Sequence, residues 1–174
     1  MLSPRISWSH PRRGTENRSG GCLCGGVRFE VTGSPLWVAY CHCASCRRHT
    51  ASPVSCYAGF EPSRVRFLTA TPATCKLSPG VARSFCNRCG TPLTYESKRF
   101  PGEIHFFTGT FDEAEQLEPN RHVFWHDRQR GFEVHDPLSR YGRNSSRHGA
   151  RSRSTGCSLY AREIRLEAFW RRPR

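Results

Sequence analysis

The stretches Gly21-Cys22-Leu23-Cys24-Gly25 and Cys86-Asn87-Arg88-Cys89-Gly90 lie far apart in this chain of 174 residues, yet they resemble each other. A glycine after each cysteine pair permits a knuckle, in which main-chain amides point at the sulfur atoms. Zinc binds four ligands tetrahedrally, and sites closed by four cysteines are structural. The two pairs therefore predict one structural zinc site that joins an early strand to a late one; its ligands are Cys22, Cys24, Cys86 and Cys89.

A third motif, Cys41-His42-Cys43-Ala44-Ser45-Cys46, offers three further thiolates from one short loop. Three protein ligands leave one zinc position for chemistry, so Cys41, Cys43 and Cys46 are the candidate catalytic residues. We therefore expect two zinc ions per chain, one structural and one catalytic. The alternative is a second structural zinc, with a fourth ligand from His42, His49, Cys56 or a more distant histidine.

Seven of the ten cysteines fall in these clusters, where neighbours are too close in sequence to bridge one another readily. Their spacing favours metal binding in a reducing compartment, and we expect a cytoplasmic protein. The N-terminus lacks an apolar secretory segment, and no apolar run reaches the roughly 18 residues of a membrane span. We therefore expect a soluble protein with no membrane partner.

The length predicts one domain with two basic tails. Residues 1–19 carry four basic residues and one acidic residue, and residues 143–174 carry nine and two. Residues 20–142, the expected zinc domain, hold 14 basic and 11 acidic residues, so most of the net charge of +13 belongs to the tails. Both tails are poor in apolar residues, which predicts disorder, with a short helix at 158–170 as an option.

Between the tails the pattern indicates β-structure. Val27, Phe29 and Val31 alternate with polar residues, as in a half-buried strand. Short strands with frequent Gly and Pro predict a mainly β fold with antiparallel sheets. Residues 112–117 are the only brief helical segment that we expect there. The further predicted strands are residues 36–40, 54–60, 65–68, 82–85, 104–108 and 123–125.

The order of the three cysteine motifs, with Thr91-Pro92-Leu93 after the last, resembles the glutathione-dependent formaldehyde-activating enzyme family, which also includes centromere protein V. The segments 122–127 and 136–141 are similar to the closing part of that family. The resemblance implies a zinc-stabilised β-tent fold, a structural zinc on the four-cysteine set and a catalytic zinc on Cys41, Cys43 and Cys46. It also implies a carbon–sulfur lyase that acts on S-hydroxymethylglutathione or a similar thiol adduct.

A zinc ion held by three thiolates is a poor electrophile and is suited to holding a substrate thiolate. Glutathione, the expected partner, is anionic, and Arg47, Arg48 and Arg88 lie beside the motifs where they could bind its carboxylates. Their alternative role is that of solvated surface arginines. His122 and His126 flank a strand-like segment, so we interpret them as core or cleft residues, and His42 as a group that tunes hydrogen bonding to sulfur.

The alternative function is a non-catalytic zinc scaffold or nucleic-acid-binding protein that uses the basic tails, which we do not favour. A zinc lyase for another small thiol is a further alternative. The sequence carries no signal for an oligomeric state.

Overall fold

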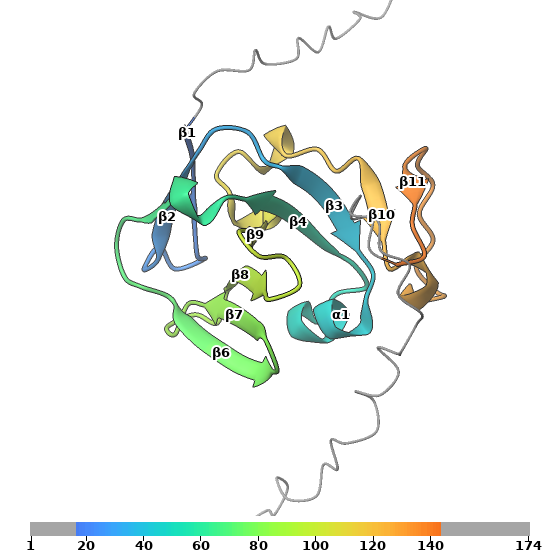
Figure 1. Ribbon diagram of the computed structural model, residues 1–174, viewed down its shortest axis with the longest axis horizontal. Coiled ribbons are helices and arrows are strands. Elements are labelled where there is room, and N and C mark those ends of the chain that lie inside the picture. The colour runs from blue at the N-terminus through green and yellow to red at the C-terminus, as the bar shows by residue number, and fades with distance from the viewer. Residues whose placement is uncertain (1–16, 144–174) are drawn as a thin grey trace, which may run out of the picture.

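The structure, a computed structural model, describes residues 17–143, which form two β-sheets (Figure 1). The smaller sheet contains three antiparallel strands, β1 (Asn17–Gly21), β2 (Arg28–Thr32) and β5 (Val65–Phe67). The expected mainly β fold is confirmed. Most of both basic tails and the optional helix at 158–170 lie outside the described residues.

The larger sheet contains eight strands. In spatial order they are β11 (Ser139–Arg140), β10 (Arg121–Val123), β3 (Trp37–Cys41), β4 (Ser55–Phe60), β9 (Ile104–Phe107), β8 (Pro92–Ser97), β7 (Val81–Phe85) and β6 (Ala73–Ser78). From β3 to β6 every pairing is antiparallel, as expected. At the other edge β10 runs parallel to both β3 and β11.

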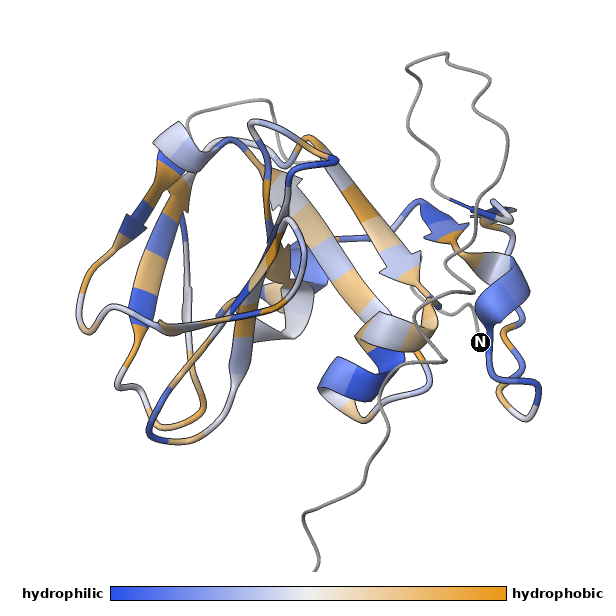
Figure 2. Cartoon of the chain, turned by 60° about the horizontal axis from the view of Figure 1, so that its bottom comes forward, coloured by the Kyte–Doolittle hydropathy of each residue, from blue (hydrophilic) through white to orange (hydrophobic). Residues whose placement is uncertain are grey.

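The main core combines residues from both sheets. Phe29 of β2 is fully buried and packs on Phe106 of β9, with ring centroids 4.5 Å apart. Val27 and Val31 are also buried, so the alternation predicted for this strand is confirmed. Figure 2 shows the same alternation of apolar and polar residues along other strands. Burial of this apolar surface is the main force that holds the two sheets together.

Several elements differ from the sequence prediction. β1 begins at Asn17, inside the segment expected to be a tail, because Gly20 lets the polar strand approach Phe29, where a Cβ would lie 2.5 Å from the ring. The strand predicted at 123–125 ends at Val123, since Phe124 has a left-handed backbone (φ 56) and a 3-10 turn follows over Trp125–Asp127. The helix predicted at 112–117 is reduced to the 3-10 turn Ala114–Gln116.

The sequence prediction lacked β1, β6, β8 and β11 and the single α-helix of the described residues, α1 (Ala44–Thr50). α1 has seven residues, of which only Cys46 is buried, so it shows no amphipathic repeat. It connects the end of β3 to the start of β4 (Figure 1). Within residues 17–143 no helix is long and apolar enough to cross a membrane.

Candidate metal centres

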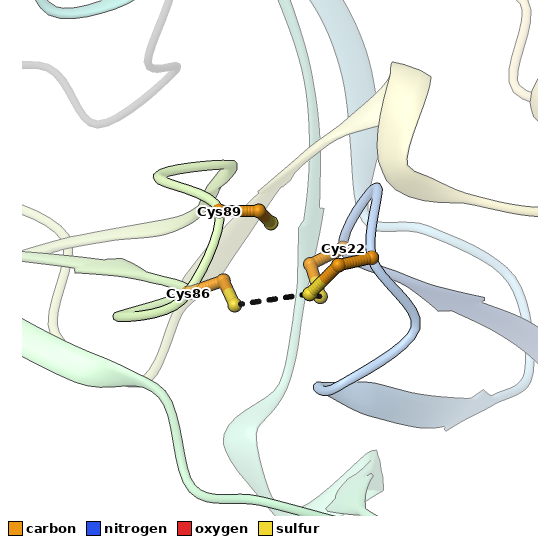
Figure 3. Close-up of side chains that lie close together, drawn as sticks. Cys22, Cys86 and Cys89 are labelled. Carbon is orange, nitrogen blue, oxygen red and sulfur yellow. Dashed lines mark hydrogen bonds between the residues drawn. The ribbon is translucent and has the colours of Figure 1, made fainter.

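Four cysteines from two distant loops meet as predicted. The loop between β1 and β2 carries Cys22 and Cys24, and the loop between β7 and β8 carries Cys86 and Cys89. Figure 3 labels Cys22, Cys86 and Cys89, whose side chains lie close together. The Sγ atoms of Cys22 and Cys24 are 3.6 Å apart, and those of Cys24 and Cys86 are 3.8 Å apart. A zinc ion with bonds of about 2.3 Å to sulfur places its ligands about 3.8 Å apart, so this set, the four-cysteine cluster, fits zinc.

Both loops of the four-cysteine cluster form the predicted knuckles. Gly25 (φ 72) and Gly90 (φ 75) adopt left-handed backbones, and their amides donate to the carbonyl oxygens of Cys22 (2.9 Å) and Cys86 (2.8 Å). The Val27 amide donates to Cys22 Sγ at 3.2 Å. These bonds fix each loop in a conformation that presents its sulfur atoms to the other loop.

Hydrogen bonds also prepare a thiolate in the four-cysteine cluster. The Thr91 hydroxyl and then backbone amides lower the pKa of Cys89 to about 5. The same hydroxyl accepts a hydrogen bond from the Leu23 amide at 3.1 Å, which ties the second loop to the first. Because zinc ligates the deprotonated thiol, this environment favours metal binding at neutral pH.

The three remaining clustered cysteines also meet, and we name Cys41, Cys43 and Cys46 the three-cysteine cluster. Cys41 ends β3, Cys43 is the N-cap of α1 and Cys46 lies within that helix. Their ligand atoms lie within 4.8 Å of one another, with Cys41 and Cys46 Sγ 3.6 Å apart. The Cys46 amide donates to Cys43 Sγ at 3.3 Å, so the helix cap itself holds two ligands together.

Electrostatics within the three-cysteine cluster favours a bound cation. Hydrogen bonds with Cys41 and then Cys43 lower the pKa of Cys46 to about 3. Hydrogen bonding with Cys43 and Cys46 raises the pKa of Cys41 far above its ordinary value. One thiolate therefore forms readily, and a divalent cation would be needed to keep all three sulfur atoms ionised. The donor set and spacing again fit zinc.

No histidine completes the three-cysteine cluster in the described residues. His42 is fully buried, but its Nε2 lies 2.8 Å from Nδ1 of His122, whose Nε2 lies 2.9 Å from the Asp136 carboxylate. His42 therefore belongs to a His–His–Asp chain, and this geometry gives it no bond to sulfur. His122 is buried as predicted, whereas the expectation for His126 is wrong, because His126 is exposed within the 3-10 turn Trp125–Asp127.

One face of the larger sheet continues from Cys41 through residues that sequence reasoning missed. Residues that pair across antiparallel strands share a face, as do residues two apart on one strand. Ala39 pairs with Tyr57, Tyr57 with Phe107, His105 with Tyr95, and Tyr95 with Arg83. The face therefore carries, with Cys41, a set of aromatic and cationic side chains; they are Tyr57, Phe107, His105, Tyr95 and Arg83.

Arg83 and Tyr57 act on the three-cysteine cluster through this face. The Arg83 guanidinium lies 4.9 Å from the centre of the Tyr95 ring, and its charge adds to the lowering of the Cys46 pKa. Burial, and then the charge of Cys46, raises the pKa of Tyr57 far above its ordinary value. The sequence placed both residues only in predicted strands, Tyr57 at 54–60 and Arg83 at 82–85, and no motif marked either of them.

The three arginines predicted for glutathione have different surroundings. Arg47 in α1 donates to the carbonyl oxygens of His42 (3.1 Å) and Asp127 (3.0 Å), so it braces the loop. Arg48 is exposed on the same helix. Arg88 is exposed between Cys86 and Cys89, in a loop of the four-cysteine cluster. The structure therefore brings only Arg47 and Arg48 to the loop of the three-cysteine cluster.

The chain is similar to a solved structure and to a protein-family model. A crystal structure of a Rhodobacter sphaeroides protein, a structural genomics target, is similar with a TM-score of 0.48 and 22% identity. The match covers 55% of this chain and 88% of that chain. A family model described as glutathione-dependent formaldehyde-activating enzyme matches residues 17–127, a span that contains both cysteine clusters. Because the match covers more than half of the sequence, the chain belongs to the glutathione-dependent formaldehyde-activating enzyme family.

Proposed function

We propose that this protein is a zinc-dependent carbon–sulfur lyase that forms or cleaves S-hydroxymethylglutathione, the adduct of glutathione and formaldehyde. The observation that carries the proposal is the three-cysteine cluster, in which Cys41 and Cys46 are buried and Cys43 is half-buried, and which has no fourth protein ligand among the described residues. Family membership supports the substrate pair. We propose residues 20–142, extended to Asn17 by β1, as the catalytic domain, with two zinc ions, in the reducing environment of the cytoplasm.

Each group of residues has a distinct task in this proposal. Cys41, Cys43 and Cys46 hold the catalytic zinc, and the four-cysteine cluster holds the structural one. When bound, zinc supplies the positive charge that keeps a substrate thiol ionised at neutral pH. Two buried aromatic residues, Tyr57 and Phe107, lie beside Cys41 and exclude water from that thiolate.

Cations around the three-cysteine cluster would recognise the carboxylates of glutathione. Arg48 is exposed on the helix that carries Cys46, and Arg83 is half-buried on the sheet face with no carboxylate partner among the described residues. We propose both as substrate-binding residues, with Arg47 as the brace of the loop. Arg88 would act at this site only if the substrate reached the four-cysteine cluster.

The test measures formaldehyde consumption by the full-length, zinc-loaded chain with and without glutathione. We expect turnover that requires glutathione and falls by more than about 100-fold in Cys46→Ser, since even residues that merely support metal ligands contribute 10–100-fold. Cys75→Ser is the matched control, because Cys75 is half-buried on β6 outside both clusters.

The same experiment separates the alternative function. If the zinc-loaded chain shows no turnover but binds DNA tightly, and this binding weakens steeply with salt, the nucleic-acid-binding function is supported instead. Turnover with another small thiol, but not with glutathione, would keep the lyase and change its substrate.

A further inference from the structure

The hydroxyl group of Tyr57 is a buried donor that has no oxygen or nitrogen partner. Only 4% of this residue is exposed, and its hydroxyl oxygen is shielded from water and forms no hydrogen bond of normal geometry. Its interaction with the Cys46 sulfur adds to the lowering of the Cys46 pKa, so the hydroxyl lies beside the three-cysteine cluster. Leaving such a group unpaired costs about 1–3 kcal/mol, so an unpaired hydroxyl in a protein core calls for an explanation. A ligand atom that arrives during function would supply the missing acceptor.

The position of Tyr57 restricts what that ligand is. Its side chain packs in one buried cluster with Cys41 and Cys46, on the sheet face that carries the three-cysteine cluster. The Phe107 ring lies against it, with centroids 4.4 Å apart, and holds the phenol in place. Tyr57 belongs to the centre of the sheet, between β3 and β9, so its hydroxyl cannot swing out to solvent without disturbing the core.

We propose that the Tyr57 hydroxyl donates a hydrogen bond to the oxygen atom of the substrate, the carbonyl oxygen of formaldehyde or the hydroxymethyl oxygen of the thiol adduct. This role rests on the proposed lyase function and names a residue that the cysteine motifs do not contain. It gives the site two halves, in which the cysteine loop serves the sulfur atom of the substrate and Tyr57 serves its oxygen atom.

The chemistry requires a donor at that oxygen. In the forming direction the substrate thiol loses its proton to solvent, and the sulfur electron pair forms the carbon–sulfur bond with formaldehyde. The carbonyl π pair moves to oxygen, which becomes an alkoxide and takes one proton from solvent. In the cleaving direction the same steps reverse, and no oxidant or reductant is needed. A preorganised donor stabilises this alkoxide in the transition state and remains protonated itself.

Tyr57→Phe tests this role, because it keeps the ring that packs on Phe107 and removes the hydroxyl alone. We expect kcat to fall about 100-fold or more, as for loss of one oxyanion donor. The dissociation constant for glutathione, which lacks the added oxygen, should change less than about twofold, since a group that acts only in the transition state does not alter binding. Zinc content and the absorption spectrum of the cobalt-substituted protein should match the wild type.

Tyr40→Phe is the matched control. Tyr40 lies on β3 beside Cys41 in sequence, but its side chain is on the opposite face, where it stacks on His122. Because Tyr40→Phe removes a hydroxyl group away from the site, it should leave kcat within about twofold of the wild type.

Each contrary result has a distinct meaning. If Tyr57→Phe keeps its kcat while the wild type turns over, the proposed role is wrong and the lyase stands. A changed cobalt spectrum or faster zinc release to a chelator would also overturn it, because the hydroxyl would then be a donor to the Cys46 sulfur. A wild-type chain with full zinc and no turnover on any thiol would overturn both the lyase and this role.

Discussion

The two cysteine clusters offer the same ligand atom, the cysteine sulfur, but they differ in their place in the fold and in their exposure to solvent. The four-cysteine cluster lies between two loops, one from each sheet, and Cys24 is exposed at its edge. The three-cysteine cluster comes from one short segment, and Cys41 and Cys46 are only 7% and 6% exposed. A metal in the first cluster would cross-link distant parts of the chain. A metal in the second would fix a local loop beside a buried surface.

This difference predicts how each metal contributes to folding. Cys24 and Cys86 are 62 residues apart, so a metal that joins them removes much conformational entropy from the unfolded chain. Cys41 and Cys46 are 5 residues apart, so a metal there restrains little that β3 and α1 do not already fix. A bound metal would therefore contribute more to folding in the four-cysteine cluster than in the three-cysteine cluster.

The largest expected effect is on stability. Cys22→Ser or Cys86→Ser should unfold the domain or lower its melting temperature drastically, since structural zinc contributes on the order of 10 kcal/mol to small domains. Cys41→Ser or Cys46→Ser should cost much less stability while abolishing turnover. Thermal unfolding with matched zinc analysis measures both. An equal loss of melting temperature from the two clusters would show that both metals are structural.

A smaller effect, on the KM for glutathione, distinguishes the arginines near the two clusters. Arg83→Gln should raise the KM for glutathione about 10-fold or more, because a hydrogen bond to a charged group contributes about 1.5–3 kcal/mol. Arg88→Gln, the matched change in a loop of the four-cysteine cluster, should leave the KM nearly unchanged. Steady-state kinetics at fixed formaldehyde measures both variants. The opposite order would mean that the substrate approaches the site from the four-cysteine cluster.

The smallest effect concerns the hairpin that presents Cys22. Asp112 binds Arg28 of β2 through a bidentate ion pair and accepts a hydrogen bond from Ser19 of β1 at 2.6 Å. Arg28 and then Ser19 lower the pKa of Asp112 to about 2. The Arg28 and Asp112 side chains are 35% and 42% exposed, so solvent screens the ion pair and Asp112→Asn should cost no more than about 1 kcal/mol at neutral pH.

The lowered pKa of Asp112 determines how the stabilisation by the Asp112–Arg28 ion pair depends on pH. The folded state holds the Asp112 proton less tightly than the unfolded state, so the ion pair stabilises the fold above the ordinary pKa of 3.8. This contribution disappears as the pH falls from 3.8 towards 2, and the stabilities of the wild type and Asp112→Asn should then converge. Urea unfolding at several pH values measures the difference. A gap that persists at pH 2 would assign the effect to packing rather than charge.

Local spacing in the sequence predicted which cysteines gather in each cluster. Cysteines two or three residues apart with a following glycine can form only a few loop geometries, and Gly25 and Gly90 adopt the one expected. The alternation around Phe29 likewise fixed which side of β2 faces the core. These features depend on a few bonds of the chain, so the sequence was sufficient to predict them.

The tertiary structure alone decided what surrounds the three-cysteine cluster. Tyr57 and Arg83 reach its face only through the pairing of five strands, and a shift of one residue in any register would turn them to the other side. His42 was expected to tune the sulfur atoms, but the parallel pairing of β10 with β3 gives it His122 as a partner instead. Register and strand order depend on packing across the whole domain, which no short segment of the sequence encodes.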